Sequence, residues 1–268
     1  MAIWPDSLFG NKVESGDRVV GFAWFPGELD DILNNLANLA EKEDWDYRYT
    51  ETIHNKPILY NYLKYSYKRL ADEKKIALSP DGNFSCFNTG LVNENQEPIY
   101  AFFEANRRPD SNPWVFKDWC TRGQRNLNVF PELPDIAHYF DDPSCLVFNV
   151  RNDFRVNIDH IINETPRDRF PSPYRDMDDY ALQTCLRGAI DNARERVRRS
   201  YKTAIPHFYQ GNVQLLLPLC LSSPKRADLA LVVELNQTFY RGTTCLTLDM
   251  AYTDARLIAK PDRDWLQP

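Results

Sequence analysis

Apolar residues recur every three or four positions in three parts of the chain, which is the spacing of an α-helix with one buried face. These parts are residues 25–45, which open with a Pro-Gly turn and acidic residues, residues 57–75, which carry a proline in their first turn, and residues 180–205. The longest has a second, mostly basic stripe, which is typical of a solvated helix face. The residues of this stripe are Arg187, Asp191, Arg194, Arg198 and Lys202. We therefore predict three principal helices.

Short apolar runs between turn signals predict strands in three regions. Residues 75–79, 84–92 and 98–105 are separated by "PDGN" and "NENQE", which predicts a three-stranded β-meander. "SCLVFNV" and "FRVNIDHII" predict a hairpin over residues 144–162, and three apolar runs within residues 212–259 predict three more strands. The pattern favours an α+β fold, with a mainly antiparallel sheet of roughly eight strands, continuous or split, and the three helices packed on it.

A chain of 268 residues can form one large domain or two small ones. The sequence contains no internal repeat, no low-complexity tract and no clean linker. We therefore predict a single α+β domain over residues 1–268, in which the Pro-rich run at residues 166–173 is the place for any weak seam.

Composition and charge narrow the class of protein. Hydrophobic residues make up 43% of the chain, which argues against disorder, and the net charge of −6 argues against a dedicated non-specific coat for nucleic acid, because such proteins carry a basic excess. Six cysteines without a CxxC pair predict reduced, mostly buried thiols rather than a zinc site or a disulfide framework. The sequence shows neither a signal-peptide pattern nor a membrane-length apolar run, so we expect a cytoplasmic protein with no membrane partner.

Asn88, Thr89 and Gly90 interrupt the second strand of the predicted meander with polar and small residues. The simpler interpretation is a β-bulge, because glycine inside a strand often marks a bulge or a close approach of the backbone. In the second interpretation the glycine lets a ligand lie against the strand, while the Asn amide and the Thr hydroxyl supply hydrogen bonds. The triplet is therefore a candidate ligand site as well as a candidate bulge.

A long irregular stretch, residues 106–135, mixes basic and aromatic side chains. This mixture suits phosphates together with stacked bases, and a loop of such length is commonly functional. The alternative is a solvated loop whose tryptophans pin it to the core. The candidate ligand-binding residues are Arg107, Trp114, Lys117, Trp119 and Arg122.

Standard catalytic signatures, including the P-loop, the dinucleotide fingerprint, the nucleophile elbow and the zinc motifs, are missing. We predict that Asp249 lies on a strand and acts as a metal ligand or general base with Arg256 as its charge partner, the alternative being a strand-end ion pair. His138 and His207 are general acid–base candidates because aromatic residues flank them. The catalytic candidates are His138, Asp249 and Arg256. The four histidines show no metal-ligand spacing, so no metal ligand is assigned.

Several phrases occur together in this chain: "FNTGL", "PIYAFFE", "LLLPLCL", "ADLALVVE" and "LTLDMAYTDARLI", the last followed by "PDRDWL". With them the chain resembles, from about the first helix to the C-terminus, a family of bacterial domains of unknown function. Members of that family occur alone or attached to RNA-binding modules of cold-shock or LOTUS type, and this chain resembles the stand-alone form. The resemblance implies work in RNA or nucleotide metabolism and supplies no catalytic residues.

These features predict a domain that binds RNA or a nucleotide and processes a phosphodiester or pyrophosphate bond, as a hydrolase or a related phosphoryl- or nucleotidyl-transfer enzyme. Arginines would hold the phosphates, a tryptophan would stack on a base, and His138 or Asp249 would move a proton or hold a divalent metal. The alternative is a non-catalytic module that binds RNA ends or a protein partner. The sequence leaves the reaction, the metal dependence and the oligomeric state open.

Overall fold

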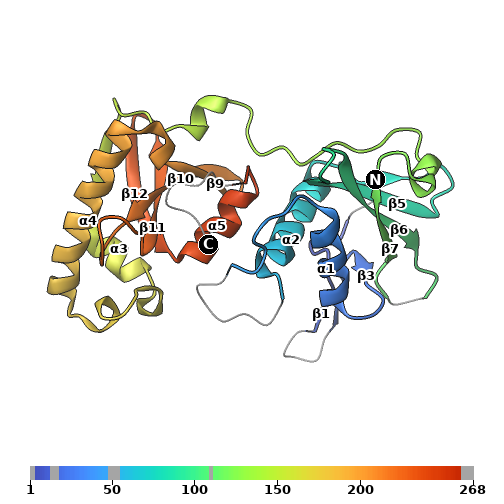
Figure 1. Cartoon of the computed structure of the whole chain (residues 1–268), viewed down its shortest axis with the longest axis horizontal. Helices are drawn as coiled ribbons and strands as arrows, with labels where there is room; N and C mark the ends of the chain where they lie inside the picture. The colour runs from blue at the N-terminus through green and yellow to red at the C-terminus, as the bar shows by residue number, and fades with distance from the viewer. Residues whose placement is uncertain (1–3, 13–17, 48–54, 109–110, 261–268) are drawn as a thin grey trace. The chain divides into compact units, whose positions relative to one another are not determined.

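The computed structural model describes residues 4–12, 18–47, 55–108 and 111–260. Its backbone contacts divide the chain into two compact units (Figure 1). We call residues 1–47 and 52–138 unit 1, and residues 48–51 and 139–268 unit 2. The Pro-rich run at residues 166–173 lies inside unit 2, whereas the main boundary falls between residues 138 and 139.

In unit 1 a five-stranded sheet has the strand order β3-β7-β6-β5-β4, and all neighbours are antiparallel except β3 and β7. The strands are β3 (Ala23–Trp24), β4 (Ala77–Leu78), β5 (Phe84–Val92), β6 (Pro98–Ala105) and β7 (Trp114–Thr121). The remaining elements are the paired strands β1 (Asn11–Lys12) and β2 (Arg18–Val19), the helices α1 (Leu29–Leu39) and α2 (Pro57–Asp72), and the 3-10 helix η1 (Arg125–Val129).

The unit 1 sheet buries side chains on both faces. On one face α2 places the fully buried Tyr67 against Phe22 and Phe87, with ring centroids 5.0 and 5.9 Å from its own. On the other face, alternate residues of β5, β6 and β7 form a second apolar cluster with Leu127 and Phe130. A sheet covered on both faces needs apolar side chains at successive positions, which is why β5 and β6 read as nearly continuous apolar runs.

In unit 2 a second five-stranded sheet has the strand order β8-β12-β11-β10-β9, with β8 parallel to β12 and the other neighbours antiparallel. Its strands are β8 (Asp153–Val156), β9 (Ile205–Tyr209), β10 (Asn212–Leu219), β11 (Leu229–Asn236) and β12 (Phe239–Leu246). Its helices are α3 (Ile158–Glu164), α4 (Asp179–Arg199) and α5 (Leu248–Arg256), with the 3-10 helices η2 (Pro143–Leu146), η3 (Arg167–Arg169), η4 (Tyr174–Asp176) and η5 (Tyr201–Thr203).

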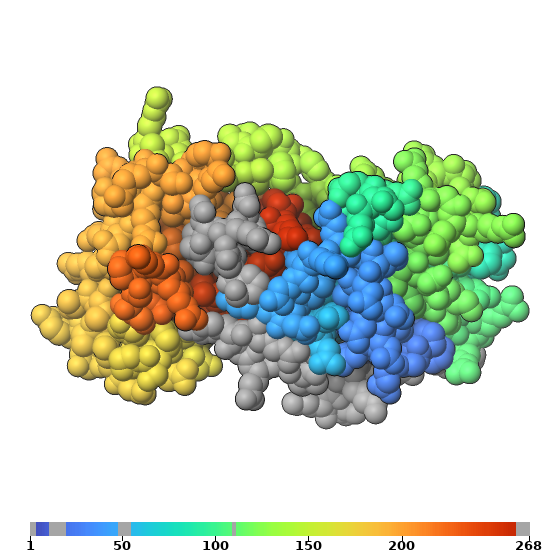
Figure 2. All heavy atoms as spheres, in the orientation of Figure 1, coloured from blue at the N-terminus to red at the C-terminus, as the bar shows by residue number. Residues whose placement is uncertain are grey.

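Helix α4 covers one face of the unit 2 sheet. Its buried Leu182 and Leu186 belong to one apolar cluster with Leu215, Leu217 and Leu231 of the sheet. The opposite side of α4 lies on the surface of the unit (Figure 2). The stripe predicted there from the sequence is exposed at Arg187, Asp191, Arg198 and Lys202 and half-buried at Arg194.

The α+β class and the mainly antiparallel pairing are confirmed, but the sheet and helix counts are not. In the described ranges, two five-stranded sheets are present where one sheet of roughly eight strands, continuous or split, was predicted, and five α-helices are present where three were predicted. The three predicted helices correspond to α1, α2 and α4. No helix in the described ranges is long and apolar enough to cross a membrane. The six cysteines are free thiols, of which three are buried and three half-buried.

The two additional helices occupy sequence that was predicted to be strand. In the expected hairpin over residues 144–162, strand β8 ends at Val156 and α3 begins beyond Asn157, whose side chain caps the helix by accepting a hydrogen bond from the His160 N–H. In the last apolar run, β12 ends at Leu246 and α5 begins at Leu248. The stretch from Leu246 to Ala251 alternates between apolar and other residues, yet it also fits the helical period that α5 adopts.

The stretch expected to be irregular contains strand β7. Phe103 pairs with Phe116 whereas Phe102 pairs with Asp118, so Lys117 is an extra residue in a β-bulge. The bulge shifts the buried positions out of simple alternation, which hides the strand in the sequence.

Candidate functional site

The Asn88-Thr89-Gly90 triplet is a β-bulge whose polar groups are used inside unit 1. The pairing of β5 with β6 shifts register between Asn88 and Val92. The Thr89 hydroxyl donates to the carbonyl of Ile99 at 2.7 Å, and the Asn88 side-chain oxygen accepts from the Gly90 N–H at 3.0 Å. Asn88 is 5% exposed and Thr89 is 1% exposed. The Asn88 side-chain nitrogen donates to the carbonyl of Pro134 at 3.5 Å. The side chains of the triplet therefore bond to its own turn, to the neighbouring strand and to the segment at Pro134.

Gly90 is required at this bulge for two reasons. Its φ of +75° lies in the left-handed region that side chains other than glycine rarely adopt. A Cβ atom added to it would lie 2.6 Å from the hydroxyl of Tyr62, which in turn donates to the carbonyl of Thr89 at 3.0 Å. The close approach predicted for this glycine is thus made by a tyrosine of α2.

The two candidate tryptophans are core residues of unit 1. Trp114 is 7% exposed and Trp119 is 5% exposed, and the indole N–H of Trp119 donates to the carbonyl of Ile32 at 3.0 Å. Lys117 is exposed and pairs with Glu104 at 2.7 Å, and Arg107 and Arg122 are exposed as well. This arrangement matches the alternative in which the tryptophans pin the segment to the core, because neither ring presents an open face to a ligand.

The catalytic candidates are divided between the two units. His138 belongs to unit 1, and its backbone N–H donates to the carboxylate of Glu73 while its carbonyl accepts from Arg69 at 2.8 Å. Asp249 and Arg256 belong to α5 of unit 2, at its first and last turns. The buried Asp249 carboxylate accepts from the Thr247 hydroxyl and from the Met250 N–H, so it stabilises the start of α5.

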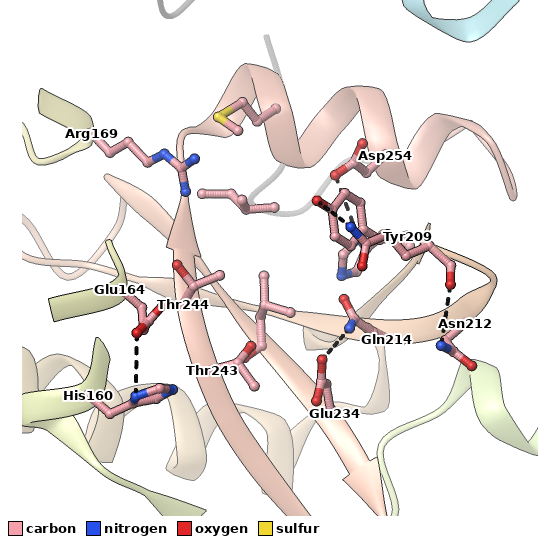
Figure 3. A pocket seen from close by; sticks show the side chains of 15 residues that line it. His160, Glu164, Arg169, Tyr209, Asn212, Gln214, Glu234, Thr243, Thr244 and Asp254 are labelled. Atoms are coloured by element: carbon pink, nitrogen blue, oxygen red, sulfur yellow. Dashed lines mark hydrogen bonds and ion pairs between the residues drawn. The ribbon is translucent and has the colours of Figure 1, made fainter. Parts of the chain in front are cut away.

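A cavity of about 410 Å³ lies in unit 2, on the sheet face opposite α4 (Figure 3). Strands β9 to β12 form its floor, α5 covers part of it, and α3 and η3 border it beside β12. The residues lining it include His160, Glu164, Arg169, His207, Tyr209, Gln214, Glu234, Thr243, Thr244, Met250 and Asp254. Of these, the sequence pattern indicates His207 alone as a candidate.

Strand alternation explains why polar groups gather in this cavity. Leu215 and Val233 pair with each other and face α4, so their neighbours Gln214 and Glu234 point to the opposite face. His207 pairs with Gln214 across β9 and β10. The three polar side chains therefore form a row across three adjacent strands, which we call the polar row.

His207 is the most unusual residue of the cavity. It is 1% exposed, and neither of its ring nitrogens has a hydrogen-bond partner among the described residues. Its Nδ1 lies 3.8 Å from the Oδ2 of Asp254, a residue that α5 carries above β9. Buried polar groups in proteins are nearly always hydrogen-bonded, and a group that is not commonly marks a site completed by a ligand or water.

Arg169 brings a permanent positive charge to the border of the cavity near β12. One of its terminal nitrogens donates to the carbonyl of Cys245 at 3.1 Å, which fixes the guanidinium. A guanidinium carries five N–H donors, so others are available to an anion. Figure 3 shows the Arg169 side chain extending into the same space that the polar row faces.

The cavity mixes both signs of charge. It is lined by three carboxylates, those of Glu164, Glu234 and Asp254, and by one arginine and two histidines. The Nδ1 of His160 lies 4.0 Å from Glu164. Nowhere in the part of the chain that the structure describes do three or more His, Cys, Asp or Glu side chains form a group that could hold a metal ion.

Comparison with known proteins identifies a family but no function. The model of a domain of unknown function, DUF3825, matches residues 36–265 and so spans most of both units. No curated protein and no solved structure matches the chain.

Proposed function

The chain belongs to the family of this domain of unknown function, and we propose that it binds a nucleotide or the phosphorylated end of an RNA strand in the unit 2 cavity and hydrolyses a pyrophosphate or phosphodiester bond there. The observation that carries the proposal is His207, a buried histidine beside a carboxylate with both nitrogens unpartnered among the described residues. A histidine in a cavity with a carboxylate neighbour is a common proton-transfer group in enzymes.

His207 would act as the general base. Asp254 faces Nδ1 and would orient the ring. Nε2, which is buried in this structure, would accept a proton from a water molecule that the bound ligand holds against it. The water oxygen forms a bond to phosphorus while the bond from phosphorus to the leaving oxygen breaks. One proton of the water passes to His207 and the other stays on the new phosphate. The released oxygen carries the electron pair of the broken bond, and His207 returns its proton to solvent.

The leaving group decides between the two reactions. A phosphate leaving group is stable as an anion at neutral pH, because its second pKa is about 6. An alkoxide leaving group needs a proton from a second acid on the far side of phosphorus. A pyrophosphate bond therefore needs His207 alone, whereas a phosphodiester would also need a second acid such as His160 at the border of the cavity.

Size and charge favour a small ligand. Pockets for small molecules commonly measure about 300–1,000 Å³, and this cavity measures about 410 Å³. The guanidinium of Arg169 would hold a phosphate oxygen, as arginine does in many phosphate sites. The net charge of −6 opposes the binding of long duplexes, whereas a short ligand contacts only the local charges of the cavity.

The test is a paired binding and turnover experiment on the full chain. Calorimetry with nucleoside mono-, di- and triphosphates measures binding, and phosphate release with and without Mg²⁺ or Mn²⁺ measures turnover. The tryptophans of the described ranges all lie in unit 1, so tryptophan quenching does not report on this cavity. We expect His207→Gln to lower turnover roughly 10²- to 10⁴-fold, the contribution typical of a positioned general base.

The outcomes separate the competing functions. Loss of turnover in His138→Gln but not in His207→Gln would show that His138, the residue predicted from the sequence, is the general base. Binding without turnover under any metal condition would leave a non-catalytic module for nucleotides or RNA ends. Absence of binding to every nucleotide would refute the proposal.

A further inference from the structure

The middle of the cavity floor presents hydrogen-bond acceptors. In the polar row, the amide nitrogen of Gln214 donates to one carboxylate oxygen of Glu234 (Figure 3). This bond uses a donor of Gln214 and orients both groups. Both residues are half-buried and line the cavity, and among the described residues no protein group bonds to the second carboxylate oxygen of Glu234 or to the amide oxygen of Gln214. Two acceptor oxygens therefore lie on neighbouring strands, one on β10 and one on β11.

Acceptor oxygens select the chemistry of the group that they bind. A carboxylate repels a phosphate and accepts hydrogen bonds from hydroxyl groups. Two adjacent acceptors suit two adjacent hydroxyls, and an acidic side chain that binds sugar hydroxyls is a recurring device in dinucleotide sites. The 2′-hydroxyl is the group that distinguishes a ribonucleotide from a deoxyribonucleotide.

The strand register places the acceptor oxygens of Gln214 and Glu234 between an aromatic ring and a guanidinium. Tyr209 lies two residues beyond His207 on β9, roughly 7 Å from the polar row along the strand, and is 50% exposed. On the other side of the row, Arg169 donates a hydrogen bond to the carbonyl of Cys245, and Cys245 pairs with Leu231 of β11. Leu231 precedes Glu234 by three residues, so Arg169 is held roughly 10 Å along the strands from the row, in the direction opposite to Tyr209. An exposed aromatic ring, a pair of acceptors and a guanidinium thus follow one another along the floor.

This order matches the order of base, ribose and phosphates in a nucleotide. Resting on the proposed function, we propose that Gln214 and Glu234 bind the 2′- and 3′-hydroxyls of a ribose and that the cavity thereby selects ribonucleotides over 2′-deoxyribonucleotides. The base stacks on Tyr209 at the β9–β10 turn, and the distal phosphate pairs with Arg169. The phosphates then follow the ribose toward Arg169, and the phosphorus attacked by water is the one nearest the row, at the end of it where His207 lies on β9.

The test compares ribonucleoside diphosphates with their 2′-deoxy counterparts by calorimetry, using ADP, GDP, CDP and UDP against the deoxy forms. A hydrogen bond to a charged group contributes about 1.5–3 kcal/mol, so we expect the deoxy forms to bind the wild-type chain roughly 10- to 100-fold more weakly. Glu234→Gln replaces an acceptor oxygen with a donor of the same size, and we expect this preference to fall to within about threefold. Glu195→Gln, an exposed carboxyl on α4, is the matched control and should keep the preference.

The failure of this inference differs from the failure of the proposed function. Equal affinity of the wild-type chain for both sugars would overturn the inference while the cavity remained a nucleotide site. A preference that survives Glu234→Gln in a folded variant would place sugar selection elsewhere and would also overturn it. Absence of binding to either sugar would overturn the proposed function itself. The wild-type ratio tests the inference even if Glu234→Gln does not fold.

Discussion

Replacing His207 with leucine should make unit 2 more stable and at the same time abolish turnover. The imidazole is 1% exposed and leaves two nitrogens without partners among the described residues, so the folded state carries a desolvation cost that the unfolded state does not. Each unsatisfied buried polar group lowers the free energy of unfolding by about 1–3 kcal/mol, and leucine removes this cost. Imperfect packing of the leucine lowers the free energy of unfolding by about 1 kcal/mol. The free energy of unfolding should therefore rise by about 1 kcal/mol or more.

Urea unfolding followed by far-UV circular dichroism, together with hydrogen exchange of the amides of residues 205–219, measures this change. Tryptophan fluorescence is unsuitable because the tryptophans of the described ranges report on unit 1. His160→Leu is the matched control, since its ring is 35% exposed and lies 4.0 Å from Glu164, and it should change stability by no more than about 0.5 kcal/mol.

A destabilised His207→Leu variant would refute the reasoning. A loss of about 1 kcal/mol or more would mean that the ring nitrogens have good partners in solution, so that the histidine is a structural residue. A gain in stability combined with lost turnover is instead the pattern of a group kept for function at the expense of stability. The sign of the change thus decides between the two roles.

Three further predictions concern the packing of unit 1 and the thiols. Gly90→Ala should lower the free energy of unfolding of unit 1 by about 2–4 kcal/mol, measured by tryptophan fluorescence in urea. Adding Tyr62→Phe should recover part of that loss, because it removes the hydroxyl that lies 2.6 Å from the new Cβ. Equal losses with and without Tyr62→Phe would contradict this. Although burial opposes its ionisation, a hydrogen bond from Lys75 and further donors hold the pKa of Glu73 below its usual range, so the carboxylate stabilises the fold at neutral pH and loses this effect as pH falls through the lowered pKa. Glu73→Gln should therefore cost about 1 kcal/mol at pH 7 and progressively less as pH falls through the lowered pKa, and a loss that does not depend on pH would contradict this. Burial raises the pKa of three thiols to about 11 or 12, so iodoacetamide should modify them at pH 8 only after unfolding, and rapid labelling of the native chain, read by mass spectrometry, would contradict this. These thiols are Cys86, Cys120 and Cys245.

Local patterns correctly predicted the helices α1, α2 and α4 and the meander of β4, β5 and β6. The apolar stripes of α1, α2 and α4 repeat over at least three turns, and a period sustained for that long is hard to mistake. The start of α5 was predicted as strand because six residues from Leu246 alternate as well as they fit a helix. A split sheet was one of the two predicted forms, but the boundary at residue 138 was not predicted, because Pro131 and Pro134 belong to the stretch predicted to be irregular and alternation gives no strand order.

The candidate site was harder to predict than the fold. A polar break in an apolar strand is visible in the sequence, yet the polar groups of the triplet bond to the bulge itself and to neighbouring segments of unit 1. Two residues of the polar row, Gln214 and Glu234, can be recognised in the sequence as polar residues near the ends of apolar runs. Its meaning depends on the pairing of β9, β10 and β11, which brings His207 beside them, and this pairing is a property of the tertiary structure.

Hydrogen–deuterium exchange of the full chain with and without millimolar ribonucleoside diphosphates, read peptide by peptide, tests most directly whether the unit 2 cavity is the functional site. We predict slower exchange in peptides that cover residues 205–214 and 229–236, with no change in those that cover residues 84–92 and 114–121. Slower exchange confined to the unit 1 peptides, or no change anywhere, would contradict the assignment.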